Sequence, residues 1–285
     1  MRGLYTLIVE NEKGEQLELT NNSNYDVLSI EGTNPPVATI NTVNISGFDG
    51  SKFNSSRIEQ RNLVITLNIR SPVEINRLAL YKYFRVKRYC KIYYKNDNRD
   101  VYIEGYVESF ENNPFTQLQQ PQISIICPKP FWNEIDELIV NFSDMIPLFE
   151  FPFSIEAEGI EFSRIEKFSN VVINTGDVET GGIIEFHAGS NQILNPKFYN
   201  YTTSKFFGLD FEMYEGDVIV INTQVGEKSV KLLRGNISIN ILSDRSEGST
   251  WILFEPGENE IGYSADDGAT NLDVSVKIIK KYEGV

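Results

Sequence analysis

The sequence predicts a mainly β protein of two domains, and three observations lead to this prediction. Apolar residues recur at every second position in most candidate strands, which is typical of strands with one buried face. Turn-forming pairs such as Lys13-Gly14 and Pro256-Gly257 separate these runs, as between antiparallel strands. The length of 285 residues exceeds the size at which one hydrophobic core usually stops growing.

The first strand with a clear pattern is "NLVITLNI", residues 62–69. Leu63, Ile65, Leu67 and Ile69 alternate with polar or smaller residues, so all four are expected on one buried face of a sheet.

A single helix is predicted directly after this strand, in "SPVEINRLALYKYF", residues 71–84. Ser71 is expected as the N-cap, Pro72 as the first helical residue and Glu74 as the partner of the cap. The apolar side chains expected to dock the helix on a sheet are Val73, Leu78, Leu80, Tyr81 and Phe84.

The stretch "ICPKPFW", residues 126–132, is predicted to end the first domain. Pro128 and Pro130 lack the backbone N–H that a strand needs, so they should stop the strand that reaches Cys127. Phe131 and Trp132 are expected to fold back over the open end of the first core. The following segment "NEIDELIV" fits either a short helix or a strand.

Two more alternating strands are predicted near the C-terminus. "NISINIL" places Ile237, Ile239 and Ile241 on one face, and "LDVSVKII" does the same for Leu272, Val274, Val276 and Ile278. Asp267-Gly268, in "SADDGATNLD", is expected to be a hairpin turn and not a calcium loop, because the ligand positions of an EF-hand are missing.

Charge is divided unequally between residues 1–134 and 135–285, which we take as the two domains. The first contains 15 basic and 15 acidic residues and the second 11 basic and 25 acidic. A strongly acidic half repels nucleic acid. Cys90 and Cys127 are expected to be buried thiols, with no disulfide or zinc site. The N-terminus lacks the layout of a secretory signal, and no run is apolar for long enough to cross a bilayer.

The residues favour a protein that is not an enzyme and has no metal or cofactor site. His187 is the only histidine, and no nucleophile-elbow sequence accompanies it; on a strand it would share a face with Ile183 and Glu185. The acid pairs Glu156/Glu158 and Glu258/Glu260 are two residues apart, so in a strand each pair lies side by side on a solvated face instead of across a cleft.

The segment "YKYFRVKRYCKIYYK", residues 81–95, is the best candidate for an interaction site. Five cations alternate with Tyr and Phe in it: Arg85, Lys87, Arg88, Lys91 and Lys95. A protein interface is favoured over a plain solvated surface, and single-stranded nucleic acid is the third alternative. No sequence-specific nucleic-acid binding is expected, because the surrounding half is neutral.

Segments from both halves resemble the distal tail proteins of long-tailed bacteriophages. In the second half the similar segments include "GDVIVINT", "KSVKLL" and "WILFEPGENEIGYS", and in the first half "SRIEQRNLVITLNI", "RDVYIEGYVESFE" and "CPKPFW". The order of the segments matches as well as their wording, and the resemblance covers nearly the whole chain.

The resemblance implies a structural protein of the phage tail tip. Members of the family form a hexameric ring that joins the tail tube protein to the hub or baseplate proteins and to host-adsorption proteins, including receptor-binding proteins. The implied folds are a ring-forming β-barrel-like domain with one helix for residues 1–134 and a galectin-like β-sandwich for residues 135–285. The implied location is the virion tail tip, after assembly in the bacterial host cytoplasm, without membrane contact.

The galectin-like fold does not by itself imply a sugar site. Trp251 is followed by Ile-Leu-Phe and not by the galectin pattern. A carbohydrate-binding module for host cell-wall glycans remains the alternative function, with Tyr199, Tyr201 or Trp251 as its aromatic contacts.

Overall fold

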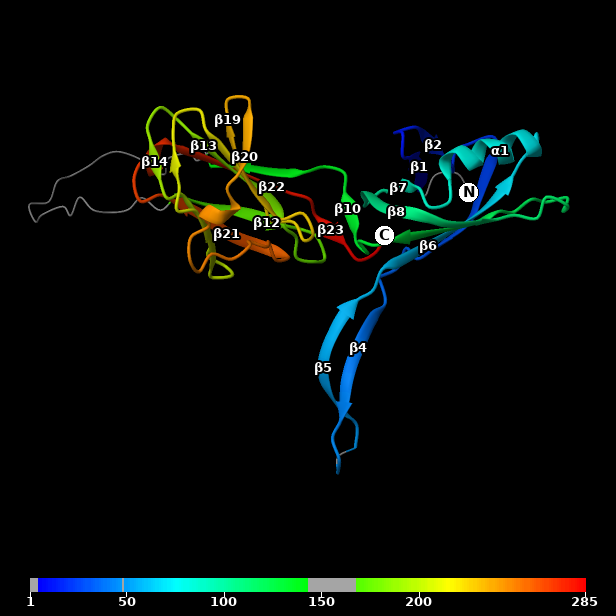
Figure 1. The fold of residues 1–285 in the computed structure, drawn as a ribbon. Helices are drawn as coiled ribbons and strands as arrows, with labels where there is room; N and C mark the ends of the chain where they lie inside the picture. The colour runs from blue at the N-terminus through cyan, green and yellow to red at the C-terminus, as the bar shows by residue number, and fades with distance from the viewer. Residues whose placement is uncertain (1–4, 48, 143–167) are drawn as a thin grey trace, which may run out of the picture. The chain divides into compact units, whose positions relative to one another are not determined.

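The computed structural model describes residues 5–47, 49–142 and 168–285, and it is mainly β, as the sequence predicts (Figure 1). The chain divides into two compact units. Unit 1 comprises residues 1–135 together with Lys281–Val285, and unit 2 comprises Asp136–Lys280. The return of the last five residues to unit 1 differs from the expected domain limits, which assigned them to the second domain. The cause is a short C-terminal strand that pairs within the sheet of unit 1.

Unit 1 is built on one antiparallel sheet with the strand order β2-β1-β7-β8-β9-β6-β3, and β10 links β8 to β23. The pairing is an open path among the described residues, without a pair that closes it into a barrel. The strands are β1 (Thr6–Asn11), β2 (Gln16–Glu18), β3 (Tyr25–Glu31), β6 (Arg61–Ile69), β7 (Tyr89–Lys95), β8 (Asp100–Glu111), β9 (Gln122–Cys127), β10 (Trp132–Glu134) and β23 (Lys281–Tyr282).

Strand β6 confirms the predicted alternation. Leu63, Ile65 and Leu67 are completely buried, and Ile69 is nearly so. β6 lies between β9 and β3, so both of its edges are paired and one face supplies the core of unit 1.

Helix α1 (Val73–Tyr83) forms where the sequence predicts it, but its cap and its buried face differ. Pro72 is the N-cap, and no side chain caps the first turn. Asn76, which is buried, secures the start of the helix instead: its side chain donates to the carbonyl of Arg70, and its own carbonyl accepts from the Tyr25 hydroxyl. A neutral amide makes these bonds without the desolvation cost of a charge.

The helix buries a narrower surface than expected. Leu80 and Phe84 enter the core, whereas Leu78 is 52% exposed and Tyr81 38% exposed. The expectation that all five apolar side chains dock on the sheet was therefore wrong for these two. They lie on the outer side of α1, where the Tyr81 ring meets the edge of the Phe110 ring at 4.9 Å and the Arg77 guanidinium at 5.9 Å.

The segment "ICPKPFW" ends β9 at Cys127, and the chain then re-enters the same sheet as β10. Trp132 is completely buried and lies 6.1 Å from the ring of Tyr94, in agreement with the predicted fold-back over the core. The next residues are strands, so the strand alternative for "NEIDELIV" is the one the structure adopts: β11 (Leu138–Asn141) follows β10.

Arg61 holds several segments of unit 1 together at this end of the sheet. Its guanidinium is buried and donates to the backbone carbonyls of Gly32, Asn34, Pro130 and Glu283. Its charge also lies 6.0 Å from the centre of the Trp132 ring. Burial lowers the pKa of Arg61 from its ordinary value, and the cluster of carbonyl oxygens offsets the loss of water around the charge.

Between β3 and β6 the chain forms a separate two-stranded hairpin of β4 (Ala38–Asn44) and β5 (Ser51–Ile58) (Figure 1). All residues of both strands are exposed, and neither strand pairs with the main sheet.

Unit 2 is a β-sandwich whose two sheets share one hydrophobic core. The six-stranded sheet has the order β11-β22-β13-β18-β19-β20, and the four-stranded sheet has the order β12-β21-β15-β16. The strands not yet named are β12 (Phe168–Asn174), β13 (Gly182–Ala188), β15 (Lys197–Asn200), β16 (Lys205–Gly208), β18 (Val218–Asn222), β19 (Ser229–Arg234), β20 (Ile237–Asn240), β21 (Gly257–Ser264), β22 (Leu272–Ile278) and a small pair of β14 (Ile193–Leu194) with β17 (Glu212–Met213).

The two predicted strands near the C-terminus have different outcomes. Leu272, Val274, Val276 and Ile278 are buried in β22, as predicted. In β20, however, Ile237 is 64% exposed and Ile239 42% exposed, because this strand forms the edge of its sheet and extends beyond the core. Alternation alone does not distinguish a central strand from an edge strand.

The chain turns at Asp267-Gly268 between β21 and β22, but the predicted hairpin is wrong, because these two strands belong to different sheets. Gly268 has φ of 76°, and a Cβ there would lie 2.2 Å from the carbonyl oxygen of Gln192, so the position requires glycine.

Candidate functional site

The cationic segment predicted as an interaction site spans the end of α1, a tight turn and strand β7. Arg85, Val86, Lys87 and Arg88 are all exposed in the turn, and Lys87 has a left-handed backbone with φ of 65°. The N–H of Lys87 donates to the carbonyl of Val107, which fixes the turn against β8. The turn therefore presents three cations and one apolar side chain from a fixed backbone.

Three of the five predicted cations are paired with acids of the same unit. Arg88 lies 3.6 Å from Glu12, Lys91 lies 3.9 Å from Glu104, and Lys95 forms an ion pair with Asp100. Among the residues that the structure describes, Arg85 and Lys87 make no ion pair. The structure thus does not gather the five charges into one patch, and the two unpaired cations lie in the turn.

The outer face of β7 is an aromatic surface with balanced charge. Tyr93 packs 6.1 Å from Tyr102 and donates a hydrogen bond to Glu10, while the ammonium of Lys91 lies 4.4 Å above the Tyr102 ring. Burial and the bond to Glu10 raise the pKa of Tyr93 to about 12, so its phenol stays neutral. A face on which cations are already matched by carboxylates and rings offers little attraction to phosphate groups.

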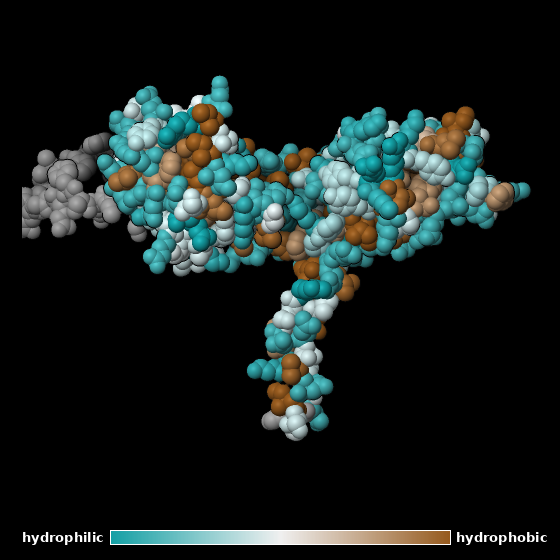
Figure 2. All heavy atoms as spheres, viewed as in Figure 1, coloured by the Kyte–Doolittle hydropathy of each residue, from teal (hydrophilic) through white to brown (hydrophobic). Residues whose placement is uncertain are grey.

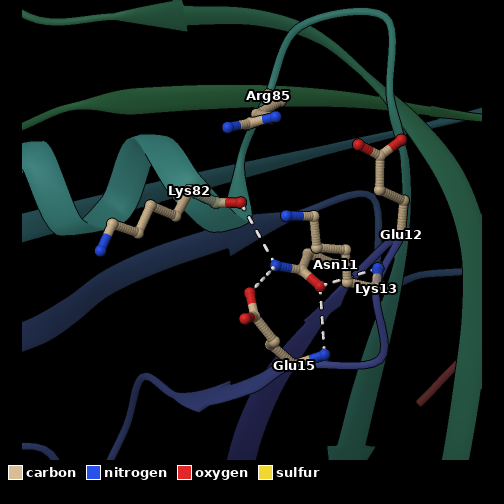
Figure 3. Close-up of a pocket in the computed structure, with 6 residues that line it drawn as sticks. All are labelled: Asn11, Glu12, Lys13, Glu15, Lys82 and Arg85. Atoms are coloured by element: carbon tan, nitrogen blue, oxygen red, sulfur yellow. Dashed lines mark hydrogen bonds between the residues drawn. The ribbon is translucent and has the colours of Figure 1, made fainter.

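A hollow of about 260 Å³ lies beside this segment, between the β1–β2 turn and the end of α1 (Figure 3). Lys82 and Arg85 line one side of it, and the turn residues Glu12, Lys13 and Glu15 line the other.

The side-chain amide of the buried Asn11, at the base of this hollow, uses both its nitrogen and its oxygen in hydrogen bonds that stabilise the turn. Its amide nitrogen donates to Glu15 at 2.7 Å and to the Lys82 carbonyl at 3.4 Å, and its oxygen accepts from the backbone N–H groups of Lys13 and Glu15. The arrangement connects the turn to the helix and leaves no polar atom of Asn11 for a ligand.

His187 lies on β13 in a row with Ile183 and Glu185, as the alternation predicts. Its Nε2 is 3.4 Å from Glu185, whose carboxylate also accepts from Lys277 at 2.9 Å. The three side chains form a surface ladder across β13 and β22. The part of the chain that the structure describes contains no group of three His, Cys, Asp or Glu residues arranged to hold a metal ion.

The acid pairs have separate outcomes. Glu258 and Glu260 are exposed on β21, on the solvated side that alternation predicts. Glu156 and Glu158 lie outside the described residues. No helix in the described ranges has the length and apolar character needed to cross a membrane.

The aromatic residues of the carbohydrate-binding alternative are found in two settings. Trp251 is half-buried against Phe207 at 5.0 Å, and Lys228 lies 5.5 Å from its ring. Tyr199 and Tyr201 stack on each other at 5.6 Å on the four-stranded sheet. Tyr199 also lines a shallow hollow of about 350 Å³, together with Lys197, Phe206, Asp210, Ser246 and Glu247.

The sequence patterns did not predict the exposed apolar side chains of unit 1. The largest fractions belong to Phe115 at 96%, Val37 at 79%, Leu118 at 68%, Ile75 at 67%, Phe53 at 59% and Ile40 at 56%. The β-branched residues Thr39, Ile40, Thr42 and Val43 in "ATINTVN" favour a strand, but nothing in the segment shows that the strand lacks a sheet to pair with.

Comparisons with known proteins agree with the architecture. Residues 12–127 match the family described as the phage tail protein RIFT-related domain, and residues 175–278 match the siphovirus-type tail component, C-terminal domain. A search of curated proteins finds no match.

Two solved structures share the fold over almost the full chain. One is the Dit protein (gp 19.1) of phage SPP1, described as a paradigm of the hub adsorption apparatus in phages that infect Gram-positive bacteria. It has 14% identity and a TM-score of 0.68, with 97% of this chain and 98% of that chain covered. The other is a chain of the phage p2 baseplate in its activated conformation, with 11% identity, a TM-score of 0.54 and 99% of both chains covered.

The two matched segments follow each other in the order that the sequence resemblance requires, one in each unit, and together they span most of the chain. The chain belongs to the family of distal tail proteins of long-tailed bacteriophages.

Proposed function

We propose that this structural component of the phage tail tip forms a closed ring of six copies. In this proposal the ring joins the tail tube protein on one side to the hub or baseplate proteins on the other, and unit 1 makes the contacts between copies. The observation that carries the proposal is the exposure of large apolar side chains on the neutral unit, which a chain of this kind would cover by assembly.

The division of charge supports this arrangement. Unit 1 contains sixteen basic and sixteen acidic residues, whereas unit 2 contains ten basic and 24 acidic residues. Copies that meet through unit 1 avoid the repulsion that would oppose contacts between acidic units. A conduit with neutral or acidic walls also lacks fixed cations that would hold DNA phosphates during passage.

The turn with Arg85 and Lys87 is a candidate contact for an acidic surface of a neighbouring tail protein. Both cations lack an ion pair among the described residues, and Val86 between them is 50% exposed. Arg88, Lys91 and Lys95 would add less, because their charges are already paired. Receptor-binding proteins are further expected partners, and assembly would take place in the cytoplasm of the bacterial host.

Immunogold electron microscopy of the virions tests the location. Antibodies raised against the purified chain should label only the distal end of the tail. Label along the tube or on the capsid would contradict the proposal. Antibodies against the tube protein of the same virions give the matched control, because they should label the whole tail.

Glycan binding by unit 2 is a second candidate function. The stacked Tyr199 and Tyr201 beside a hollow with Asp210 and Glu247 favour it, because rings and carboxylates together can contact a hydroxyl-rich ligand. A glycan array with the full chain and with Tyr199→Ala tests this candidate. Binding that the substitution abolishes would support it, and an array without signal would contradict it.

A further inference from the structure

The hairpin of β4 and β5 is the least supported element of unit 1. A two-stranded hairpin without a covering layer is at best marginally stable in water. Every residue of both strands is exposed, and each strand pairs only with the other. A hairpin that keeps its shape in the assembled particle therefore needs a surface from another molecule to cover it.

The register divides the hairpin into an apolar face and a polar face, because cross-strand partners point to the same side. Four pairs lie on the apolar side: Ala38 with Ile58, Ile40 with Ser56, Thr42 with Phe53 and, near the tip, Asn44 with Ser51. The pairs on the polar side are Thr39 with Arg57, Asn41 with Ser55 and Val43 with Lys52.

A bulge places Phe53 on the apolar side. The register shifts between Asn41 and Thr42, which leaves Asn54 without a partner in the opposite strand. Without this extra residue, strict alternation from Ile58 would point Phe53 to the polar side. The bulge thus joins Phe53, which is 59% exposed, to Ile40, which is 56% exposed.

A second apolar surface lies on the outer side of α1. Ile75, Leu78 and Tyr81 are spaced three residues apart, so they form one stripe along the helix. Their exposed fractions are 67%, 52% and 38%. Figure 2 shows hydrophobic atoms gathered over α1 and, separately, along the hairpin.

The two surfaces lie at opposite ends of β6. The hairpin enters β6 at Arg61, and α1 follows the other end at Ile69. Nine residues of strand span about 30 Å at roughly 3.3 Å per residue, so one molecule cannot bring the two surfaces together without breaking its sheet. Two different and mutually compatible surfaces facing apart are what a head-to-tail ring requires.

We propose that the apolar face of the hairpin of one copy packs on the α1 stripe of the next copy. This inference rests on the proposed ring and names the surfaces that form it. We infer a second copy of this chain as the partner because both surfaces belong to unit 1, which has no net charge. Contacts through unit 2 would instead bring together two units that each have fourteen more acidic than basic residues.

The area that the hairpin offers agrees with a partial role in the interface. The flat face is about 25 Å long and 10 Å wide from the strand dimensions, or about 250 Å². Each partner of a stable interface contributes about 800 Å². The hairpin therefore supplies about a third of one side, and neighbouring parts of unit 1 supply the rest.

Cross-linking of introduced cysteines tests the contact. The double variant Phe53→Cys/Leu78→Cys, treated with a short bismaleimide, should give a ladder of covalent oligomers on a denaturing gel. Each single variant should remain uncross-linked. The native thiols should not react with the bismaleimide, because Cys90 and Cys127 are buried and their pKa values are raised to about 12. Ser55→Cys/Leu78→Cys is the matched control, with the cysteine on the polar face, and it should give no ladder.

A second variant pair tests the same contact by affinity. Phe53→Asp should weaken self-association at least about tenfold, because it places a charge in an apolar contact, whereas Ser55→Asp should change it less than about twofold. A ladder from Phe53→Cys alone would overturn the inference in favour of a contact between two hairpins. Unchanged assembly of Phe53→Asp would place the contact elsewhere and leave the ring intact. Failure of the unsubstituted chain to assemble would instead contradict the proposed ring itself.

Discussion

Replacement of Arg61 by Met should destabilise unit 1 by about 3–5 kcal/mol. The substitution keeps an apolar side chain of similar length but removes the donors for four backbone carbonyls, those of Gly32, Asn34, Pro130 and Glu283. A net hydrogen bond contributes about 1 kcal/mol, and a buried acceptor left without a donor costs about 1–3 kcal/mol. Methionine also removes the free-energy cost of burying the guanidinium charge, which offsets part of this loss. Because four carbonyl acceptors lose their donor together, the lost hydrogen bonds should outweigh the removed desolvation cost.

Urea unfolding followed by tryptophan fluorescence measures this effect. Trp132 and Trp251 are the only two tryptophans, so the background Trp251→Phe leaves Trp132, beside Arg61, as the sole reporter of unit 1. Arg57→Met is the matched control, because Arg57 makes an exposed ion pair that water screens, so its loss should leave the unfolding free energy nearly unchanged. Carboxypeptidase should also remove the C-terminal residues faster from Arg61→Met. An unfolding free energy within about 1 kcal/mol of the parent would refute the reasoning.

Three further predictions concern stability and reactivity. Gly105→Ala should cost about 1–3 kcal/mol in urea unfolding, because its Cβ would lie 2.8 Å from a backbone carbonyl oxygen of β9; a neutral result would show that the sheet can shift. The hydrogen-bonded ion pair with Arg234 lowers the pKa of Asp217, so its stabilisation is present above about pH 4 and is lost as the pH falls through the folded-state pKa. Asp217→Asn should flatten that acid dependence, and an unchanged urea midpoint profile would contradict the assignment. Cys90 and Cys127 should resist a thiol reagent at pH 8 and react after unfolding, whereas rapid reaction in the folded protein would show that they are accessible.

Local periodicity was sufficient to predict the elements that lie in the interior of a sheet. Strand β6 and strand β22 have paired neighbours on both sides, so alternation in the sequence corresponds directly to burial. Helix α1 was predictable from its composition. Its buried face was not, because which side of a helix is covered depends on elements distant in the sequence, here β1.

Edge strands and contacts between distant segments could not be predicted from the sequence. The segment around Ile239 has the same pattern as a core strand, yet β20 is the last strand of its sheet among the described residues. The pairing of β23 with β10 joins residues about 150 positions apart, and no local sequence pattern predicts such a pairing. In the sequence Arg61 looks like an ordinary surface cation. Its role depends on four backbone carbonyls from different segments, which only the folded chain brings together.

The candidate site was predictable only in part. The cationic composition of residues 81–95 singled out the segment, but it did not predict the exposed turn within it, and the pairing of Arg88 with Glu12 and of Lys91 with Glu104 depends on strand register. The same holds for the hairpin, where a one-residue bulge decides the direction of Phe53.

The mass of the purified full chain in solution tests the central claim most directly. Native mass spectrometry at the highest concentration at which the chain stays soluble should detect a species of six 32.5 kDa chains, about 195 kDa in total. A species of 32.5 kDa alone at that concentration would contradict the claim that unit 1 joins copies of this chain into a ring.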